Sequence, residues 1–200
     1  MKKTIVISGK PGAGSSSVAK ALAEDLNFSY FSPGTVFKMI SKGNIEKIPF
    51  KKEVVLIFKE QGIDITKLGN RGGLLSFWGD EIGSSKKFHE ALDAVQIFFA
   101  KKGSIVIDGK LSITFLKEYT DVSVWVNARK DIRAKRYVKR ENISLKDALE
   151  LIRKRELFER KNWKKIYGFD YFTQEQKADV VIDSTNKNIG QIVSFIKNKL

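Results

Sequence analysis

Short apolar runs alternate along the chain with segments in which apolar residues recur every three or four positions. The runs are rich in β-branched residues and are typical of buried parallel strands. They cover Thr4–Ser8, Phe28–Phe31, Ser104–Asp108, Val122–Val126 and Asp179–Asp183. Strands that alternate with helices form a parallel sheet covered on both faces, so the pattern predicts an α/β fold with a five-stranded parallel sheet.

The periodic segments between these runs predict the helices. They cover Ser16–Leu26, a segment that begins at Ser32-Pro33, His89–Lys102, Arg129–Arg140, Ser144–Lys165 and Ile189–Leu200. Ser32 is expected to cap its helix, because serine accepts a hydrogen bond from the first turn and proline suits that turn. In residues 43–75, glycines interrupt short helical pieces, so we expect a mobile, mostly helical insertion that Phe77 and Trp78 anchor.

The first strand runs directly into a glycine-rich segment, Gly9–Ser16. A strand, a glycine-rich turn and a helix start form a phosphate-binding loop, in which backbone N–H groups point at an oxyanion. The spacing G-x-x-x-x-G fits from Gly9 to Gly14, and Ser16 lies where a hydroxyl meets Mg²⁺, but Ser15 replaces the lysine of G-K-[ST]. The alternative is a tight turn in another doubly wound protein.

Length and composition limit the class of protein. A chain of 200 residues suits one domain with a hydrophobic core. It has no cysteine, which excludes disulfides and thiolate metal sites and fits a reducing compartment. No apolar run approaches the roughly 20 residues of a membrane span, and the N-terminus enters a strand at once. We therefore expect a cytoplasmic protein without a membrane segment or signal peptide.

The net charge of +14 indicates anionic partners. Residues 129–165 hold 15 Lys and Arg against 6 Asp and Glu, so +9 of this charge lies in one segment. The segment is interpreted either as a basic lid over phosphates or as a solvated helical face. A role in binding RNA or DNA also stays open, because contacts to phosphates need only such a patch.

Two further residues are candidates for chemistry. Asp108 ends a buried strand, where P-loop proteins keep a carboxylate that orients Mg²⁺, although a capping role is the alternative. His89 lies among charged residues and is expected on the solvated surface. No Ser/His/Asp or Cys/His set indicates covalent catalysis, and phosphoryl transfer requires none, because positioning and charge neutralisation carry it.

Several longer segments carry a family resemblance. The stretch ISGKPGAGSSSVAKALAEDL looks like a kinase phosphate loop, and FSPGTVFK resembles the pattern S-x-G-[DT]-x-F-R. LDAVQIFFAKKGSIVIDGKL is similar to I-D-x-R-Q followed by [DE]-G-R-L, and WKKIYGFD resembles R-Y-x-x-I-Y-G-I-D. Almost end to end, the chain therefore resembles the nucleoside monophosphate kinases, and within them the archaeal-type cytidylate kinases. Only residues 43–88 lack a clear counterpart.

This resemblance implies a P-loop nucleoside monophosphate kinase-like fold with a helical lid. Residues 1–200 would form a single domain, with a mobile acceptor-binding region at 32–88 and a basic lid at 129–165. The implied reaction transfers the γ-phosphoryl group of ATP to CMP or dCMP with Mg²⁺. The implied partners are these nucleotides rather than nucleic acid or membrane, and we expect a monomer.

The resemblance also assigns roles to individual residues. The ATP-binding residues are Gly9, Lys10, Gly12, Ala13, Gly14, Ser15, Ser16 and Ser17, and the metal would be held by Ser16 and Asp108. The acceptor-binding residues are Ser32, Lys38, Asp93, Gln96 and Lys110. The lid cations that carry catalysis are Arg133, Arg136, Arg153 and Arg155.

At five positions the arginine or lysine of the family pattern is replaced, either by lysine in place of arginine or by a neutral residue. They are Ser15, Lys38, Val95, Lys110 and Asn162. One lost charged hydrogen bond costs roughly 1.5–3 kcal/mol, or about tenfold to a hundredfold in rate when it acts in the transition state. The chain is therefore interpreted as an active cytidylate kinase or, alternatively, as a catalytically weakened or inactive nucleotide-binding homologue that acts as a sensor or partner.

Two further hypotheses are compensation by other cations and an altered acceptor. Lys10, Arg160 and Lys161 lie near the lost positions in sequence and are candidates for compensation. A solvated loop lysine is the alternative for Lys10. A kinase for a different small acceptor also stays open, because the selectivity of such an enzyme would lie in residues 43–88.

Overall fold

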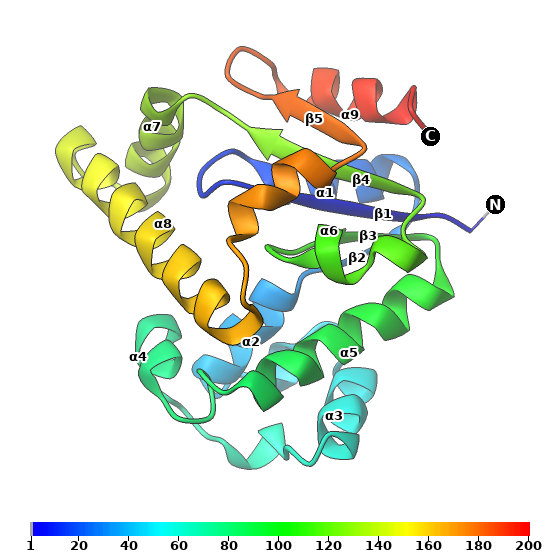
Figure 1. Ribbon diagram of the computed structural model, residues 1–200, viewed down its shortest axis with the longest axis vertical. Coiled ribbons are helices and arrows are strands. Elements are labelled where there is room, and N and C mark those ends of the chain that lie inside the picture. Colours follow the sequence, from blue (N-terminus) through cyan, green and yellow to red (C-terminus); the bar gives the residue numbers. More distant parts are fainter. Residues whose placement is uncertain (1) are drawn as a thin grey trace.

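Five parallel strands form the centre of the computed structural model, which describes residues 2–200 with the exception of the Leu75 side chain (Figure 1). The strands are β1 (Thr4–Gly9), β2 (Ser29–Phe31), β3 (Ile105–Asp108), β4 (Val122–Asn127) and β5 (Val180–Asp183). Their order in the sheet is β2-β3-β1-β4-β5, and every pairing is parallel. The predicted five-stranded parallel sheet is confirmed, with strand ends within one residue of those expected.

The helices also follow the periodic segments of the sequence. They are α1 (Ser15–Asp25), α2 (Pro33–Ser41), α3 (Lys51–Glu60), α4 (Leu74–Gly79), α5 (Lys86–Lys102), α6 (Ser112–Phe115), α7 (Lys130–Glu141), α8 (Leu145–Tyr167) and α9 (Ile189–Lys197). Ser32 caps α2 as predicted, because its hydroxyl accepts a hydrogen bond from the Thr35 N–H. Ser144 caps α8 in the same way through the Asp147 N–H.

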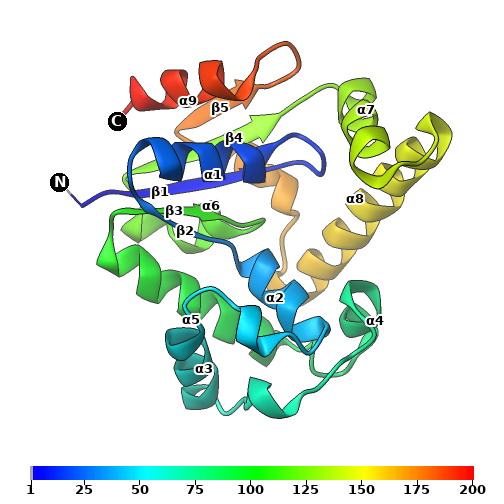
Figure 2. The same ribbon diagram turned by 180° about the vertical axis from the view of Figure 1, so that it is seen from behind.

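Alternate residues of each strand enter two different cores. Ile5 and Ile7 of β1 pack with α1 and α9 on one face, whereas Val6 packs with α2, α5 and α6 on the other. Figure 2 shows α1 and α9 in front of the sheet, and Figure 1 shows α5 and α6 on the opposite side. Helices on both faces follow from this alternation, because each face of a parallel sheet must be covered.

Residues 43–88 form a second packed region below the sheet (Figure 1). Its helices α3 and α4 surround an aromatic centre made by Phe37, Phe58, Phe77 and Phe88, each of them buried. Phe77 lies with its ring centroid 4.9 Å from that of Phe37 on α2. The prediction that Phe77 anchors this region to the body is therefore confirmed, and the mobility of the region stays a prediction.

One sequence prediction in this region is wrong. His89 was expected on the solvated surface, but it is only 2% exposed. Its ring stacks on Trp78 and meets the edge of Trp163 on α8, with centroid distances of 4.8 and 5.0 Å. Burial lowers the pKa of His89 to about 4. The charged neighbours of His89 in sequence point elsewhere, and the residues that cover it come from distant segments, which a local pattern does not reveal.

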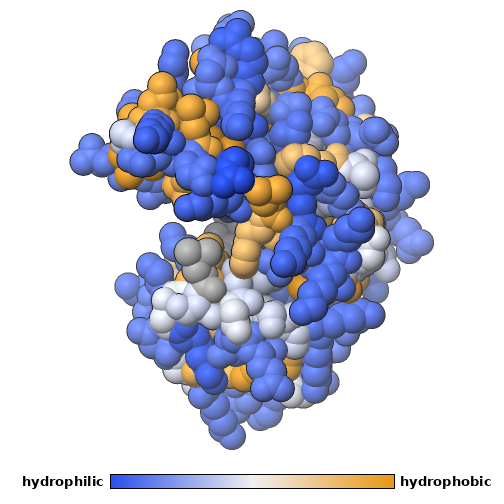
Figure 3. Space-filling model, turned by 60° about the vertical axis from the view of Figure 1, so that its left-hand side comes forward, coloured by the Kyte–Doolittle hydropathy of each residue, from blue (hydrophilic) through white to orange (hydrophobic). Residues whose placement is uncertain are grey.

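A notch separates the upper part of the molecule, which holds the sheet and α7, from the lower part with α2 to α5 (Figures 1 and 3). Within residues 2–200, no helix has the length and apolar character needed to cross a membrane. The carboxyl ends of β1 and β3 lie side by side, because Ile7 pairs with Asp108 in the parallel register. Ligands of open parallel sheets bind at these ends, and the loop after β1 lies there.

Candidate active site at the carboxyl ends of the strands

The loop between β1 and α1 has the geometry of an anion cradle. The N–H of Ala13 donates to the carbonyl of Lys10 at 3.0 Å and closes the turn. Gly14 precedes α1 with φ of 98°, a left-handed conformation that favours glycine. Gly12 has φ of 80°, and a Cβ atom there would lie 2.9 Å from the Tyr137 ring. Both glycines are therefore required by the backbone, and the loop presents the N-terminus of an 11-residue helix to a ligand.

Ser16 and Asp108 meet beside this loop as the sequence predicted. The Ser16 hydroxyl donates to the Asp108 carboxylate at 2.5 Å, and the Tyr30 hydroxyl donates to the same oxygen at 3.3 Å. Burial raises the pKa of Asp108, and the Ser16 hydrogen bond and the Lys110 ammonium oppose that shift. A hydroxyl and one carboxylate at the end of a P-loop are a donor set that suits Mg²⁺.

Arg133 and Arg136 of α7 bind the outer side of the loop. Arg133 is buried and donates to the Pro11 carbonyl at 3.0 Å and to Glu156 of α8 at 2.5 Å. Arg136 donates to the Ala13 carbonyl at 2.8 Å and to the Ser184 hydroxyl at 3.0 Å. Two of the four predicted lid cations, Arg133 and Arg136, therefore contact the loop.

Lys110 also reaches the loop, from the end of β3. Its ammonium donates to the Gly9 carbonyl at 2.6 Å and lies 3.9 Å from the Glu159 carboxylate. Burial lowers the pKa of Lys110, and Glu159 opposes that shift. Arg155, a turn before Glu159 on α8, donates to the same carboxylate at 2.7 Å and to the Tyr137 hydroxyl at 2.9 Å. Lys110 and Arg155 therefore share one counter-ion.

Arg153 is not brought to this site. Its guanidinium is about half exposed and binds Glu150 one turn earlier on α8. It lines a separate surface hollow with Lys130, Leu145 and Lys146. Arg153 therefore lies apart from Arg133, Arg136 and Arg155 in this conformation, because its position on α8 points it away from the loop.

The predicted acceptor residues form a second polar group. Gln96 of α5 accepts a hydrogen bond from the Ser112 hydroxyl at 2.5 Å and donates to Asp93 at 3.0 Å. Asp93 also accepts from the Tyr167 hydroxyl at 2.5 Å, and burial raises the pKa of Asp93 to about 7. Ser32 is buried at the start of α2, whereas Lys38 is exposed on the same helix.

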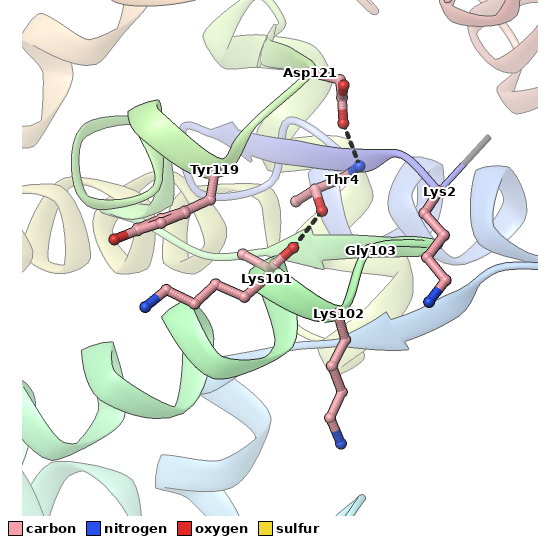
Figure 4. A pocket seen from close by; sticks show the side chains of 8 residues that line it. Lys2, Thr4, Lys101, Lys102, Gly103, Tyr119 and Asp121 are labelled. Carbon is pink, nitrogen blue, oxygen red and sulfur yellow. Dashed lines mark hydrogen bonds between the residues drawn. The ribbon is translucent and has the colours of Figure 1, made fainter.

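A different pocket lies at the opposite end of the sheet (Figure 4). Its lining includes Lys2, Thr4, Lys101, Tyr119 and Asp121. The Thr4 N–H donates to Asp121 at 2.7 Å, and the Thr4 hydroxyl donates to the Ala100 carbonyl, so the polar groups there bind one another. Because Thr4 begins β1, this pocket is remote from the loop that follows Gly9.

Comparison with known proteins identifies the family. The model of the cytidylate kinase-like family matches residues 4–186. The chain belongs to this family. Cytidylate kinases of Methanocaldococcus jannaschii and Ignicoccus hospitalis are 27% and 30% identical to it, each over 98% of this chain and over 96% and 98% of their own lengths. Membership supports a kinase-type function with nucleotides as substrates.

Solved structures agree on the fold. An uncharacterized protein from Eubacterium ventriosum superposes with a TM-score of 0.63 at 18% identity, over 99% of this chain and 98% of that one. Shikimate kinase from Bacteroides thetaiotaomicron gives a TM-score of 0.55 at 17% identity, over 100% and 98%. The fold is thus that of the P-loop kinases, as the resemblance implied.

Two of the three cations proposed for compensation in this family member have other partners, and the third, Lys161, is exposed on α8. Lys10 lies 3.7 Å from Glu175 and 5.3 Å from the centre of the Phe172 ring, so it is not a solvated loop lysine. Arg160 donates to Asp170. Asn162 donates to the Phe158 carbonyl of its own helix. Val95 is fully buried in the core, so its side chain packs where the family pattern has an arginine.

Sequence reasoning missed the groups that hold the site residues in place. They are Tyr30, Tyr137, Glu156, Glu159, Tyr167 and Ser184. The pair Arg155 and Glu159 had a signal, because opposite charges four residues apart on a helix interact. The contacts of Glu156 with Arg133 and of Ser184 with Arg136 join elements that are distant in sequence, and no spacing indicates them.

Proposed function

We propose that this protein transfers the γ-phosphoryl group of ATP to CMP or dCMP in the presence of Mg²⁺. The observation that carries the proposal is the Ser16–Asp108 pair beside the glycine-rich loop of a cytidylate kinase-like family member. The loop residues Gly9 to Ser17 would bind the ATP phosphates through their backbone N–H groups, as in other P-loop proteins.

The residues beside the loop suit a magnesium ion. Within the described part of the chain, no three His, Cys, Asp or Glu side chains gather into a metal site. Mg²⁺ needs none, because it binds through one or two protein oxygens together with substrate phosphates and waters. Ser16 and Asp108 would provide those oxygens. When bound, Mg²⁺ neutralises part of the charge on the phosphates.

The cations around the loop would carry the transfer itself. An oxygen of the acceptor phosphate attacks the γ-phosphorus of ATP, the bond to the bridging oxygen breaks, and ADP leaves with that oxygen. Arg133, Arg136 and Arg155 would neutralise the charge that spreads over the phosphoryl group. We propose that residues 129–165, which hold these arginines, act as the lid of a single domain.

The acceptor would bind on the other side of the notch, in the region of residues 32–88 and α5. Ser32, Asp93 and Gln96 support this placement, because Gln96 reaches Asp93 and Ser112 beside the end of β3. A Cβ atom on Gly109 would lie 3.1 Å from the Gln96 oxygen, so this polar group adjoins Lys110. Lys38, exposed on α2, would reach the acceptor only from its rim.

A second candidate function is nucleotide binding with little or no catalysis. The observation that favours it is the loss of cations: Ser15 carries no charge, Val95 is buried in an apolar core and Asn162 binds its own helix. Such a protein would bind ATP or CMP without transferring phosphate. A nucleic-acid surface is less favoured, because Arg133 and Arg136 of the basic segment contact the loop rather than facing solvent.

A panel of acceptors tests both functions. ADP release is measured with CMP, dCMP, UMP and AMP at fixed ATP and Mg²⁺, and we expect CMP or dCMP to give the highest rate. Calorimetric titration of ATP and CMP runs in parallel. Absence of turnover with every acceptor contradicts the first proposal, and binding without turnover supports the second. RNA binding that falls steeply with salt would instead support a nucleic-acid surface on the basic segment 129–165.

A further inference from the structure

The phosphate loop lacks its lysine at position 15, yet a lysine ammonium lies at the first residue of the loop. Lys110 reaches the Gly9 carbonyl at 2.6 Å from the neighbouring strand β3. In a P-loop, the lysine after the last glycine contacts the β- and γ-phosphates of the bound nucleotide. The question is which cation of this chain makes that contact.

The parallel register places Lys110 beside the loop. Ile7 of β1 pairs with Asp108 of β3, so residues two positions further along each strand reach the same level. The Gly109 N–H donates to the Ile7 carbonyl at 3.2 Å, and the Ser8 hydroxyl donates to the Lys110 carbonyl at 3.2 Å. The backbone of Lys110 is therefore fixed against β1, and its side chain has a short path to the loop.

The side chain of Lys110 is also held by its surroundings. It is only 25% exposed, and its ammonium lies 5.6 Å from the centre of the Tyr171 ring. Glu159 faces it at 3.9 Å and accepts hydrogen bonds from Arg155 and Tyr171 at 2.7 and 2.9 Å. Glu159 thus pairs with both Lys110 and Arg155 and offsets the repulsion between these two cations. An incoming phosphate dianion would replace that carboxylate as their partner.

We propose that Lys110 supplies the charge that Ser15 lacks and binds the terminal phosphates of the donor nucleotide, with Glu159 as its positioning residue. This inference rests on the proposed kinase function. It moves Lys110 from the acceptor-binding role that the family resemblance implied to the donor side. Of the proposed compensators, Lys10 is bound to Glu175, Arg160 is bound to Asp170, and Lys161 is exposed on α8. Lys110 already contacts the loop backbone.

Charge relocation tests the proposal. Lys110→Gln removes the charge but keeps an amide that can donate to Gly9, and we expect the rate to fall by about tenfold to a hundredfold. Ser15→Lys in the wild-type background should change the rate less than about threefold, because the charge is already present. In the double variant Ser15→Lys/Lys110→Gln, the lysine at position 15 should restore at least about tenfold of the lost rate.

Three controls separate a catalytic role from a structural one. Lys110→Arg keeps the charge and should retain most of the activity. Lys197→Gln removes a surface lysine that pairs with Asp25 and should leave the rate unchanged. Thermal unfolding of each variant shows whether it is folded. If Lys110→Gln is folded, raises KM for the acceptor alone and is not rescued by Ser15→Lys, Lys110 belongs to the acceptor and the proposal is overturned.

A binding measurement keeps this proposal distinct from the proposed function. Calorimetric titration of ATP with Mg²⁺, without any acceptor, should show about tenfold weaker binding for Lys110→Gln than for Lys110→Arg. If the wild-type protein transfers phosphate to no acceptor, the proposed function fails, but weaker ATP binding by Lys110→Gln still supports the assignment of Lys110. Unchanged ATP binding overturns that assignment, whatever the outcome with acceptors.

Discussion

The two sides of the notch are built from different interactions. On the loop side, charged side chains bind backbone carbonyls: Lys110 that of Gly9, Arg133 that of Pro11 and Arg136 that of Ala13. On the lower side, residues 43–88 are held by rings such as Phe77 that pack in an apolar centre. The structure of the loop side therefore rests on charge and backbone geometry, and that of the lower, aromatic side rests on the volume and shape of its side chains.

This difference predicts that substitutions on the two sides affect different properties. A change to a loop-side residue such as Arg136 or Asp108 should alter activity or ATP binding more than stability, because these polar side chains bind the loop and lie outside the apolar cores. A change on the aromatic side should alter the free energy of unfolding and leave ATP binding by the folded protein intact. The four predictions below test this separation, starting with the largest expected effect.

Phe77→Ala should lower the free energy of unfolding by about 4 kcal/mol, because it leaves a cavity in a fully buried aromatic cluster. Chemical denaturation measures this effect. Leu56→Ala on α3, where leucine is 57% exposed, is the matched control and should change stability by less than about 0.5 kcal/mol. Folded Phe77→Ala should still bind ATP, and loss of ATP binding by the folded variant would show that the two sides are coupled.

Asp108→Asn should lower the rate on the order of a hundredfold, or about 2.7 kcal/mol, because it removes the carboxylate that would orient Mg²⁺. Its melting temperature should not fall, since burial already raises the pKa of Asp108 and the neutral amide avoids that cost. Rates measured across Mg²⁺ concentrations check this, with surface Asp25→Asn as control. A normal Mg²⁺ dependence in Asp108→Asn would assign the carboxylate a capping role.

His89, on the aromatic side, should make the free energy of unfolding depend on pH. Its pKa is about 4 in the folded protein, below the ordinary value of 6.5, so the unfolded chain binds more protons between these values. The contribution of His89 to the free energy of unfolding should therefore fall as pH falls, by about 2 kcal/mol between pH 6.5 and 4.5. The opposite shift of Asp93, whose folded pKa is about 7, makes stability rise as pH falls over the same interval.

His89→Phe separates these two contributions. The phenyl ring can keep the stacking on Trp78 but does not titrate, so the difference in unfolding free energy between the wild type and His89→Phe should follow the His89 contribution alone. Denaturation at several pH values between 4.5 and 7 measures this difference. If it is independent of pH, the histidine is not held neutral in the fold, and the aromatic side has no titrating group of this kind.

The same contrast explains which features the sequence could predict. The φ angles of 80° at Gly12 and 98° at Gly14 favour glycine. The spacing of these glycines in the sequence could therefore predict the loop. Asp108 was found because the end of a buried strand is a local signal. His89 was misplaced because Trp78 and Trp163 cover it from distant segments, and packing of that kind leaves no periodic trace. Lys110 was identified, but its contact with the Gly9 carbonyl depends on the β1–β3 register, which only the fold supplies.

Arg136→Met is the smallest of the four changes and the sharpest test of the loop side. Arg136 donates to the Ala13 carbonyl and to Ser184, so its loss should loosen the loop and lower the rate by about tenfold, or about 1.4 kcal/mol. Lys139→Met changes an exposed lysine on the same helix and should leave the rate unchanged. Equal losses in both variants would mean that the total charge of the basic segment matters rather than contact with the loop. A loss confined to Arg136→Met, with unchanged stability, would place the effect in the backbone geometry that holds the phosphates.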